Sequence, residues 1–135
     1  MDLDDPGFEH NGYEIMRAYG RSKLANILYA RYLARELDGR GVTANAVHPG
    51  SVATGIWSRA PWFARPVLAV AKRLAMVSPE EGAKTITYLA TSPEVEGRTG
   101  GYYDKNRLTQ PSDLALDDEL GDRLYAESRR LVGLS

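Results

Sequence analysis

A long amphipathic pattern followed at once by glycines and a short apolar run constrains the fold of this chain most strongly. Between Tyr13 and Leu37, apolar side chains recur at intervals of three and four, which predicts one long helix with a single apolar face. Gly39 and Gly41 follow, and glycine is typical of positions just after a helix end. Residues 42–47 then have the pattern of a short strand. Because the strand directly follows a helix, we expect an α/β fold with a parallel sheet.

The second half of the chain adds two helices and one strand. Ser78, Pro79 and Glu81 form a helix-start pattern, because serine can cap, proline suits the first helical position and Glu81 completes a capping box. Residues 100–104 resemble a second strand, and a last helix is expected from about Asp117 to Leu131. Two strands are too few for a stable sheet, so the fold is expected to need further strands.

Composition narrows the classes of function. The 135 residues suit one domain, and 17 basic against 18 acidic side chains give a formal net charge of −1, which does not attract nucleic acid. The chain has no cysteine and two histidines, so we expect neither disulfides nor a metal site. The acidic start is not a signal peptide, and no apolar run reaches the ~18 residues that would span a bilayer. A cytoplasmic protein is expected.

One pair of side chains suits proton transfer. Tyr19 and Lys23 are four residues apart on the first helix, so they share a face and can meet. A tyrosine hydroxyl has a pKa of roughly 10, and a nearby ammonium lowers it by stabilising the phenolate. Such a tyrosine can act as a general acid or base at a hydroxyl or carbonyl. The spacing alone would also fit a core tyrosine beside a surface lysine, so the neighbouring sequence must decide.

That neighbouring sequence resembles a known enzyme family. The run from Ala18 to Asn26 (Ala-Tyr-Gly-Arg-Ser-Lys-Leu-Ala-Asn) is similar to the catalytic helix of the short-chain dehydrogenase/reductase family, closest to its retinol-dehydrogenase-like and WW-domain-oxidoreductase-like members. Asn45 to Thr54 matches the same family's Asn-x-x-x-Pro-Gly-x-x-x-Thr segment, in the right order and at the right distance. The resemblance continues through the later helices and strand, and covers nearly the whole chain from Tyr13 onward.

The resemblance implies an NAD(P)-dependent oxidoreductase that interconverts an alcohol and a carbonyl. Tyr19 would be the catalytic acid or base, and Lys23 would stabilise its phenolate and hydrogen-bond the nicotinamide ribose. The nicotinamide end of NAD or NADP would be lined by four residues of the strand-end loop: Pro49, Gly50, Val52 and Thr54. Ligands of open α/β sheets bind at the carboxyl ends of strands, which fits this placement.

The stretch between Gly55 and Val77 corresponds to the family's variable substrate lid. Trp57, Trp62 and Phe63 would give it an apolar cover, which implies a lipophilic alcohol or carbonyl as substrate. Two other interpretations stay open. These aromatic side chains could seal a core, or the lid could use its basic residues to contact a membrane surface, which we rank last.

The resemblance covers only the carboxy-terminal half of a Rossmann-like, doubly wound parallel sheet. The glycine-rich turn that receives the pyrophosphate is missing from residues 1–135, and so is the residue that would select NAD or NADP. The family's catalytic serine belongs before Tyr19, where residues 1–18 contain no serine. We therefore expect a partial dehydrogenase domain without its nucleotide-binding half, unstable or inactive on its own.

Other interpretations follow from the same residues. A non-catalytic remnant would act only by associating with a full-length relative, since the tyrosine helix of the family often packs against its copy in a second subunit. An epimerase or dehydratase of the extended relatives would share Tyr-x-x-x-Lys, but the Pro49-Gly50 segment and the short carboxy-terminal region argue against it.

Overall fold

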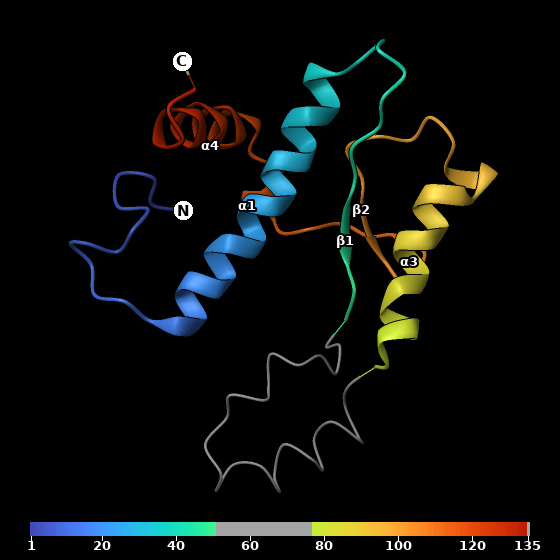
Figure 1. Ribbon diagram of the computed structural model, residues 1–135, viewed down its shortest axis with the longest axis horizontal. Coiled ribbons are helices and arrows are strands. Elements are labelled where there is room, and N and C mark those ends of the chain that lie inside the picture. The colour runs from blue at the N-terminus through green and yellow to red at the C-terminus, as the bar shows by residue number, and fades with distance from the viewer. Residues whose placement is uncertain (51–76, 135) are drawn as a thin grey trace, which may run out of the picture. The chain divides into compact units, whose positions relative to one another are not determined.

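A computed structural model describes residues 1–50 and 77–134, and it has the expected α/β composition (Figure 1). Its helices are α1 (Ile15–Glu36), α3 (Pro79–Thr91) and α4 (Asp118–Leu131), with short 3-10 turns η3 (Pro93–Val95) and η4 (Asp113–Leu116). Its strands are β1 (Ala46–His48), β2 (Tyr102–Asp104) and β3 (Arg107–Leu108), in the order β1-β2-β3 of a mixed sheet. The three predicted helices are confirmed, and each predicted helix end lies within two residues of the observed one.

Strand β3 was not predicted from the sequence. It pairs antiparallel with β2, with Tyr103 opposite Leu108 and Asp104 opposite Arg107. The two residues between the strands, Lys105 and Asn106, both have positive φ angles, 48° and 61°. This is the backbone of a two-residue hairpin whose flanking strands keep their natural twist, although it lacks the glycine that usually marks such turns.

The predicted strand at 42–47 is wrong in its first four residues, because β1 begins only at Ala46 and ends at His48. The residues before β1 are held by one backbone bond, from the Gly100 N–H to the Ala44 carbonyl at 2.8 Å, and by side chains. The Ala44 N–H donates to Thr99 Oγ1 (3.0 Å), and Asn45 accepts from the Gly101 N–H (2.9 Å) while donating to the Arg98 carbonyl (2.9 Å).

The chain divides into two compact units, which are described separately. The first comprises Met1–Ala46, Gly97–Tyr102 and Thr109–Ser135, and the second comprises Val47–Glu96 and Tyr103–Leu108. The first unit therefore contains α1, η4 and α4. The second contains α3, η3 and the hairpin turn between β2 and β3.

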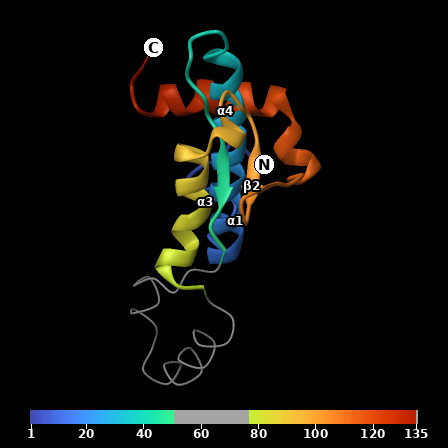
Figure 2. The same ribbon diagram turned by 90° about the vertical axis from the view of Figure 1, so that its right-hand side faces the viewer.

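The core of the first unit lies where α4 crosses α1, which Figures 1 and 2 both show. Leu28 of α1 is 1% exposed and packs with Leu120 of α4 and with Leu3. A Cβ at Gly121 would lie 3.5 Å from the Leu28 carbonyl oxygen, an ordinary contact distance, so the two helix backbones approach closely at this point.

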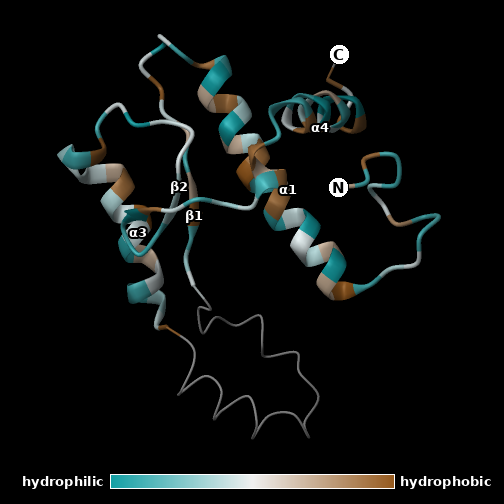
Figure 3. Ribbon diagram, turned by 180° about the vertical axis from the view of Figure 1, so that it is seen from behind, coloured by the Kyte–Doolittle hydropathy of each residue, from teal (hydrophilic) through white to brown (hydrophobic). Residues whose placement is uncertain are grey.

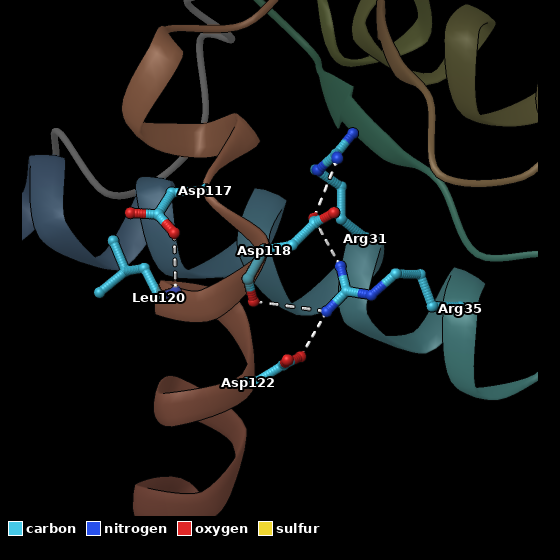
Figure 4. Close-up of polar contacts among 6 residues, drawn as sticks. All are labelled: Arg31, Arg35, Asp117, Asp118, Leu120 and Asp122. Carbon is cyan, nitrogen blue, oxygen red and sulfur yellow. Dashed lines mark hydrogen bonds and ion pairs between the residues drawn. The ribbon is translucent and has the colours of Figure 1, made fainter.

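Ion pairs surround this crossing (Figure 4). Arg31 and Arg35 both reach the Asp118 carboxylate, at 3.0 and 2.6 Å, and Arg35 also pairs with Asp122. Asp117 caps α4 by accepting the Leu120 N–H at 2.9 Å. These groups are partly exposed, so they orient α4 more than they stabilise it.

In the second unit, the predicted start of α3 is confirmed. Ser78 Oγ accepts the Glu81 N–H at 3.2 Å, and Pro79 occupies the first helical position. Inside this helix, Thr85 is 5% exposed and its hydroxyl oxygen accepts the Asn106 N–H at 3.2 Å, which ties the β2–β3 turn to α3. Among the described residues, no helix combines the length and the apolar character needed to cross a membrane.

Candidate active site

Tyr19 and Lys23 lie one turn apart on α1, in the first unit. The Lys23 Nζ is 5.2 Å from the centroid of the Tyr19 ring, so the structure brings together the two side chains that the spacing predicted to meet. Tyr19 is 54% exposed, and Lys23 is exposed beside it. A ligand could therefore reach both the phenol and the ammonium.

The backbone under Tyr19 is regular helix. Ser22 Oγ donates to the Tyr19 carbonyl at 2.7 Å, so this serine bonds to its own helix. Leu28 and Ala34 are buried further along α1, in directions that differ by about 120° around the helix axis. Positions 19 and 23 differ from position 28 by about 180° and 140°, so Tyr19 and Lys23 point away from the face that Leu28 buries.

Pro49 and Gly50 follow β1, in the second unit. Gly50 has a φ of 76°, a left-handed conformation that favours glycine. A Cβ built there would lie 3.5 Å from Val77 Cγ2, an ordinary contact. The backbone conformation, more than lack of space, is therefore the reason for glycine at this position.

A pocket of about 140 Å³ opens beside this loop within the second unit. It is smaller than the roughly 300 Å³ at which drug-sized sites begin, so by itself it would take only one end of a ligand. Glu81 and Lys84 form an ion pair at its edge. The other lining residues mix polar, charged and apolar groups: His48, Pro49, Gly50, Val77, Thr85, Asp104, Lys105 and Asn106.

Five of the predicted site residues fall outside the described ones. They are the loop positions Val52 and Thr54 and the lid aromatics Trp57, Trp62 and Phe63. Of the predicted nicotinamide-binding residues, the structure thus describes Tyr19 and Lys23 in the first unit and Pro49 and Gly50 in the second.

The sequence interpretation missed a polar network at the start of the chain. Asp5 is 4% exposed and accepts three backbone N–H bonds from residues 9–11, and Arg21 of α1 donates to the Asp5 carbonyl at 3.0 Å. Burial alone would raise the pKa of Asp5, but these N–H donors and the Asn11 side chain outweigh it and hold the pKa below its usual value. The Asp5-Pro6-Gly7 turn pattern is the one local signal that pointed to this network.

Residues 1–50 and 77–134 contain no cluster of metal-ligating side chains. No three His, Cys, Asp or Glu side chains among them gather in a way that could hold a metal ion. The phenol of Tyr19 and the ammonium of Lys23 are the pair of described groups that the sequence pattern assigns to proton transfer.

Comparison with known proteins gives consistent matches. The family model described as "Enoyl-(Acyl carrier protein) reductase" matches residues 8–103. Human retinol dehydrogenase 13 is 38% identical over 99% of this chain and 42% of its own length. Mouse polyprenol dehydrogenase is 42% identical over 98% of the chain and 40% of its own length. Human WW domain-containing oxidoreductase is 41% identical over 90% of the chain and 29% of its own length.

These relatives are much longer than the matched chain. The chain spans about two fifths of the length of retinol dehydrogenase 13 and of polyprenol dehydrogenase. Both motifs quoted from the sequence, around Tyr19 and around Pro49, lie inside the stretch that the family model matches.

Proposed function

The chain belongs to the short-chain dehydrogenase/reductase family, and from this we propose that it carries the proton-transfer residues of an NAD(P)-dependent oxidoreductase that interconverts an alcohol and a carbonyl. The observation that carries the proposal is the pairing of Tyr19 with Lys23 on an accessible face of α1. The family match supports the oxidoreductase class, and the pair supplies groups suited to its chemistry.

Tyr19 is the proposed acid and base. In carbonyl reduction its hydroxyl donates a proton to the carbonyl oxygen, and in alcohol oxidation its phenolate accepts the proton of the substrate hydroxyl. The Lys23 ammonium, 5.2 Å from the Tyr19 ring centroid, stabilises the phenolate by its charge. The nicotinamide, when bound, supplies or accepts the hydride.

The proposal assigns the nicotinamide end of the cofactor to residues of both units. Lys23 is exposed and has three donors, so it can also hydrogen-bond a ribose hydroxyl. Pro49 and Gly50 are proposed to bound the nicotinamide, with Val52 and Thr54 following in the same loop. The choice between NAD and NADP is left open by the proposal, because no described residue is assigned to the adenosine ribose.

A lipophilic substrate is the second part of the proposal. Two relatives are named for retinol and polyprenol, which are both long apolar alcohols. The proposed lid of this chain contains Trp57, Trp62 and Phe63, which would contact an apolar chain. We extend the substrate class, and no single compound, from these relatives to this protein.

Association through α1 and a cytoplasmic location belong to the proposal as well. Ile15 and Met16 are 69% and 70% exposed at the start of α1, so a second copy could cover them. The alternative function, a non-catalytic chain that only associates with a full-length relative, would use the same surface without binding nicotinamide.

Turnover of aldehydes tests the proposal. The protein is expressed from its complete reading frame, and consumption of NADH or NADPH is followed with aldehydes of increasing chain length. We expect kcat/KM to rise with chain length, and Tyr19→Phe to lower kcat on the order of 10² to 10⁴-fold, the usual contribution of a general acid or base.

Tyr29→Phe is the matched control, because Tyr29 is an exposed tyrosine on the same helix. It should keep full activity. Equal activity of Tyr19→Phe and the unaltered protein would contradict the proposed role of Tyr19. Association with a relative but no nicotinamide binding would favour the non-catalytic alternative.

A further inference from the structure

The segment before α1 is organised around one buried carboxylate. Asp5 is 4% exposed and accepts the backbone N–H groups of Glu9 (2.6 Å), His10 (3.2 Å) and Asn11 (2.9 Å). The Asn11 side chain adds a fourth bond, from Nδ2 to Asp5 Oδ2, at 3.1 Å. Hydrogen bonds to an ionised acceptor are stronger than neutral ones, so Asp5 fixes the backbone that follows it.

Arg21 joins this segment to the helix. Its guanidinium donates to the carbonyl oxygens of Asp5, at 3.0 Å, and of Asp2. The same group lies 4.4 Å from the centroid of the Phe8 ring, a cation–π contact. One planar side chain of α1 thus contacts the segment at three separate residues.

Phe8 shows that the conformation of the segment is imposed. Its φ is 59°, in the left-handed region that non-glycine residues seldom adopt. Such backbone persists where the surrounding contacts over-determine it. Here those contacts are the Asp5 hydrogen bonds, the Arg21 guanidinium and the ring of Tyr13, which meets Phe8 edge-on at 5.7 Å.

The start of α1 has little local stabilisation of its own. The capping residue Glu14 makes no side-chain cap, and the first turn has no acidic residue. Ile15 and Met16 are exposed, and Figure 3 shows this end of α1 in brown. Contacts with the preceding segment therefore matter more here than they would for a capped helix.

Arg21 and Tyr19 point in different directions from α1. Two residues along a helix correspond to a rotation of about 200°, so Arg21 projects from nearly the opposite face to Tyr19. The segment can therefore hold α1 without covering the Tyr19 ring, which is 54% exposed.

We propose that Asp5 and Arg21 are positioning residues that hold the start of α1, so that the Tyr19 hydroxyl keeps a fixed place relative to substrate. This inference rests on the proposed function, because the place of Tyr19 affects turnover only if Tyr19 transfers the proton. The clamp itself, residues 2–11 held to α1 through Asp5 and Arg21, can be tested without any assay of activity.

The test uses Asp5→Asn in the protein expressed from its complete reading frame. In this variant an NH₂ group replaces one carboxylate oxygen, and that group cannot accept a hydrogen bond from a backbone N–H. We therefore expect backbone hydrogen exchange at residues 9–11 to accelerate about tenfold or more. We also expect kcat to fall on the order of tenfold while KM changes less, because misplacing an acid slows chemistry more than binding. Asp4→Asn is the matched control, since the Asp4 side chain is exposed.

Variants of Arg21 keep the proposal testable if Asp5→Asn does not fold. Arg21→Met should also lower kcat. Arg21→Lys should keep a higher kcat than Arg21→Met, because lysine can still donate to the two carbonyls. Arg17→Met, at an exposed position of the same helix, should leave kcat unchanged. Unchanged exchange in Asp5→Asn, or faster exchange with kcat unchanged in both Asp5→Asn and Arg21→Met, would overturn the positioning role. If the unaltered protein has no turnover, the proposed function has failed and the positioning role with it, while the exchange data still decide whether the clamp exists.

Discussion

Lys23 lies beside Tyr19 on α1, and the proposed function gives its ammonium two tasks: stabilising the phenolate and hydrogen-bonding the ribose of the cofactor. Lys23→Met should therefore weaken cofactor binding and lower kcat together, by on the order of 10²-fold in kcat. Steady-state kinetics and cofactor fluorescence titration measure the two effects. Lys23→Arg keeps the charge and should retain more activity than Lys23→Met. Loss of binding without loss of kcat would leave Lys23 with the ribose task alone.

Asp5 gives a prediction for pH. Its pKa in the folded protein lies below the usual value, because the N–H donors at 9–11 outweigh the effect of burial. A carboxyl of this kind contributes stability that is fully present above its unfolded pKa and is lost as pH falls through the lower folded pKa. The charged side chains bonded into this network are Asp2, Asp5 and Arg21.

The measurement is the chemical shift of the backbone amides of residues 9–11 against pH. We expect these amides to keep their folded shifts below the usual aspartate pKa of about 3.9, and to change only at lower pH. Asp4→Asn should leave the transition where it is. A transition at or above the usual aspartate value would contradict the assignment.

At the scale of elements, the α3 helix depends on a local cap. Ser78 Oγ accepts the Glu81 N–H at 3.2 Å, so Ser78→Ala removes an acceptor from the helix start. We expect a loss of about 1 kcal/mol in the free energy of unfolding, measured by urea denaturation. Ser128→Ala, inside α4, should change the free energy of unfolding little. The variant loses the bond from the Ser128 hydroxyl to the Leu124 carbonyl, but alanine has the higher helix propensity, and the two effects offset each other. Equal losses from both variants would argue against a capping role.

The crossing of α1 and α4 allows apolar packing and ion pairs to be compared. Leu28 is 1% exposed, and Leu28→Ala should cost about 2–5 kcal/mol of unfolding free energy. Arg35 pairs with Asp118 and Asp122, but all three side chains are more than a third exposed. Arg35→Met should therefore cost about 1 kcal/mol or less, and less still at high salt. Denaturation at low and high salt checks both, and a larger loss from Arg35→Met would reverse the ranking.

For the whole molecule, the sequence predicted what depends on local patterns. Helix ends were correct where Ser78 or a glycine such as Gly39 marks them, because caps act within one turn. The proximity of Tyr19 and Lys23 also followed from helical spacing alone.

Features that depend on residues far apart in the chain could not be predicted. Asn45 bonds to Arg98 and Gly101, more than fifty residues away, and this is why strand β1 begins later than its apolar pattern suggested. The hydrogen bond from Arg21 to the Asp5 carbonyl spans 16 residues and joins a loop to a helix, so no periodic sequence pattern predicts it. One local feature was missed as well: strand β3, because Lys105-Asn106 is not a usual hairpin pair.

The proposed function makes Tyr19 the proton donor when a hydride passes from the nicotinamide to a carbonyl. The most direct measurement supplies the protein expressed from its complete reading frame with a long-chain aldehyde and with NADH or NADPH that carries deuterium at both C4 positions of the nicotinamide, and follows the label by mass spectrometry. We predict one deuterium on the carbinol carbon of the product, a loss of labelled product in Tyr19→Phe, and no loss in Tyr29→Phe. An unlabelled product would contradict hydride transfer from the nicotinamide, and equal labelling by Tyr19→Phe and Tyr29→Phe would contradict the role of Tyr19.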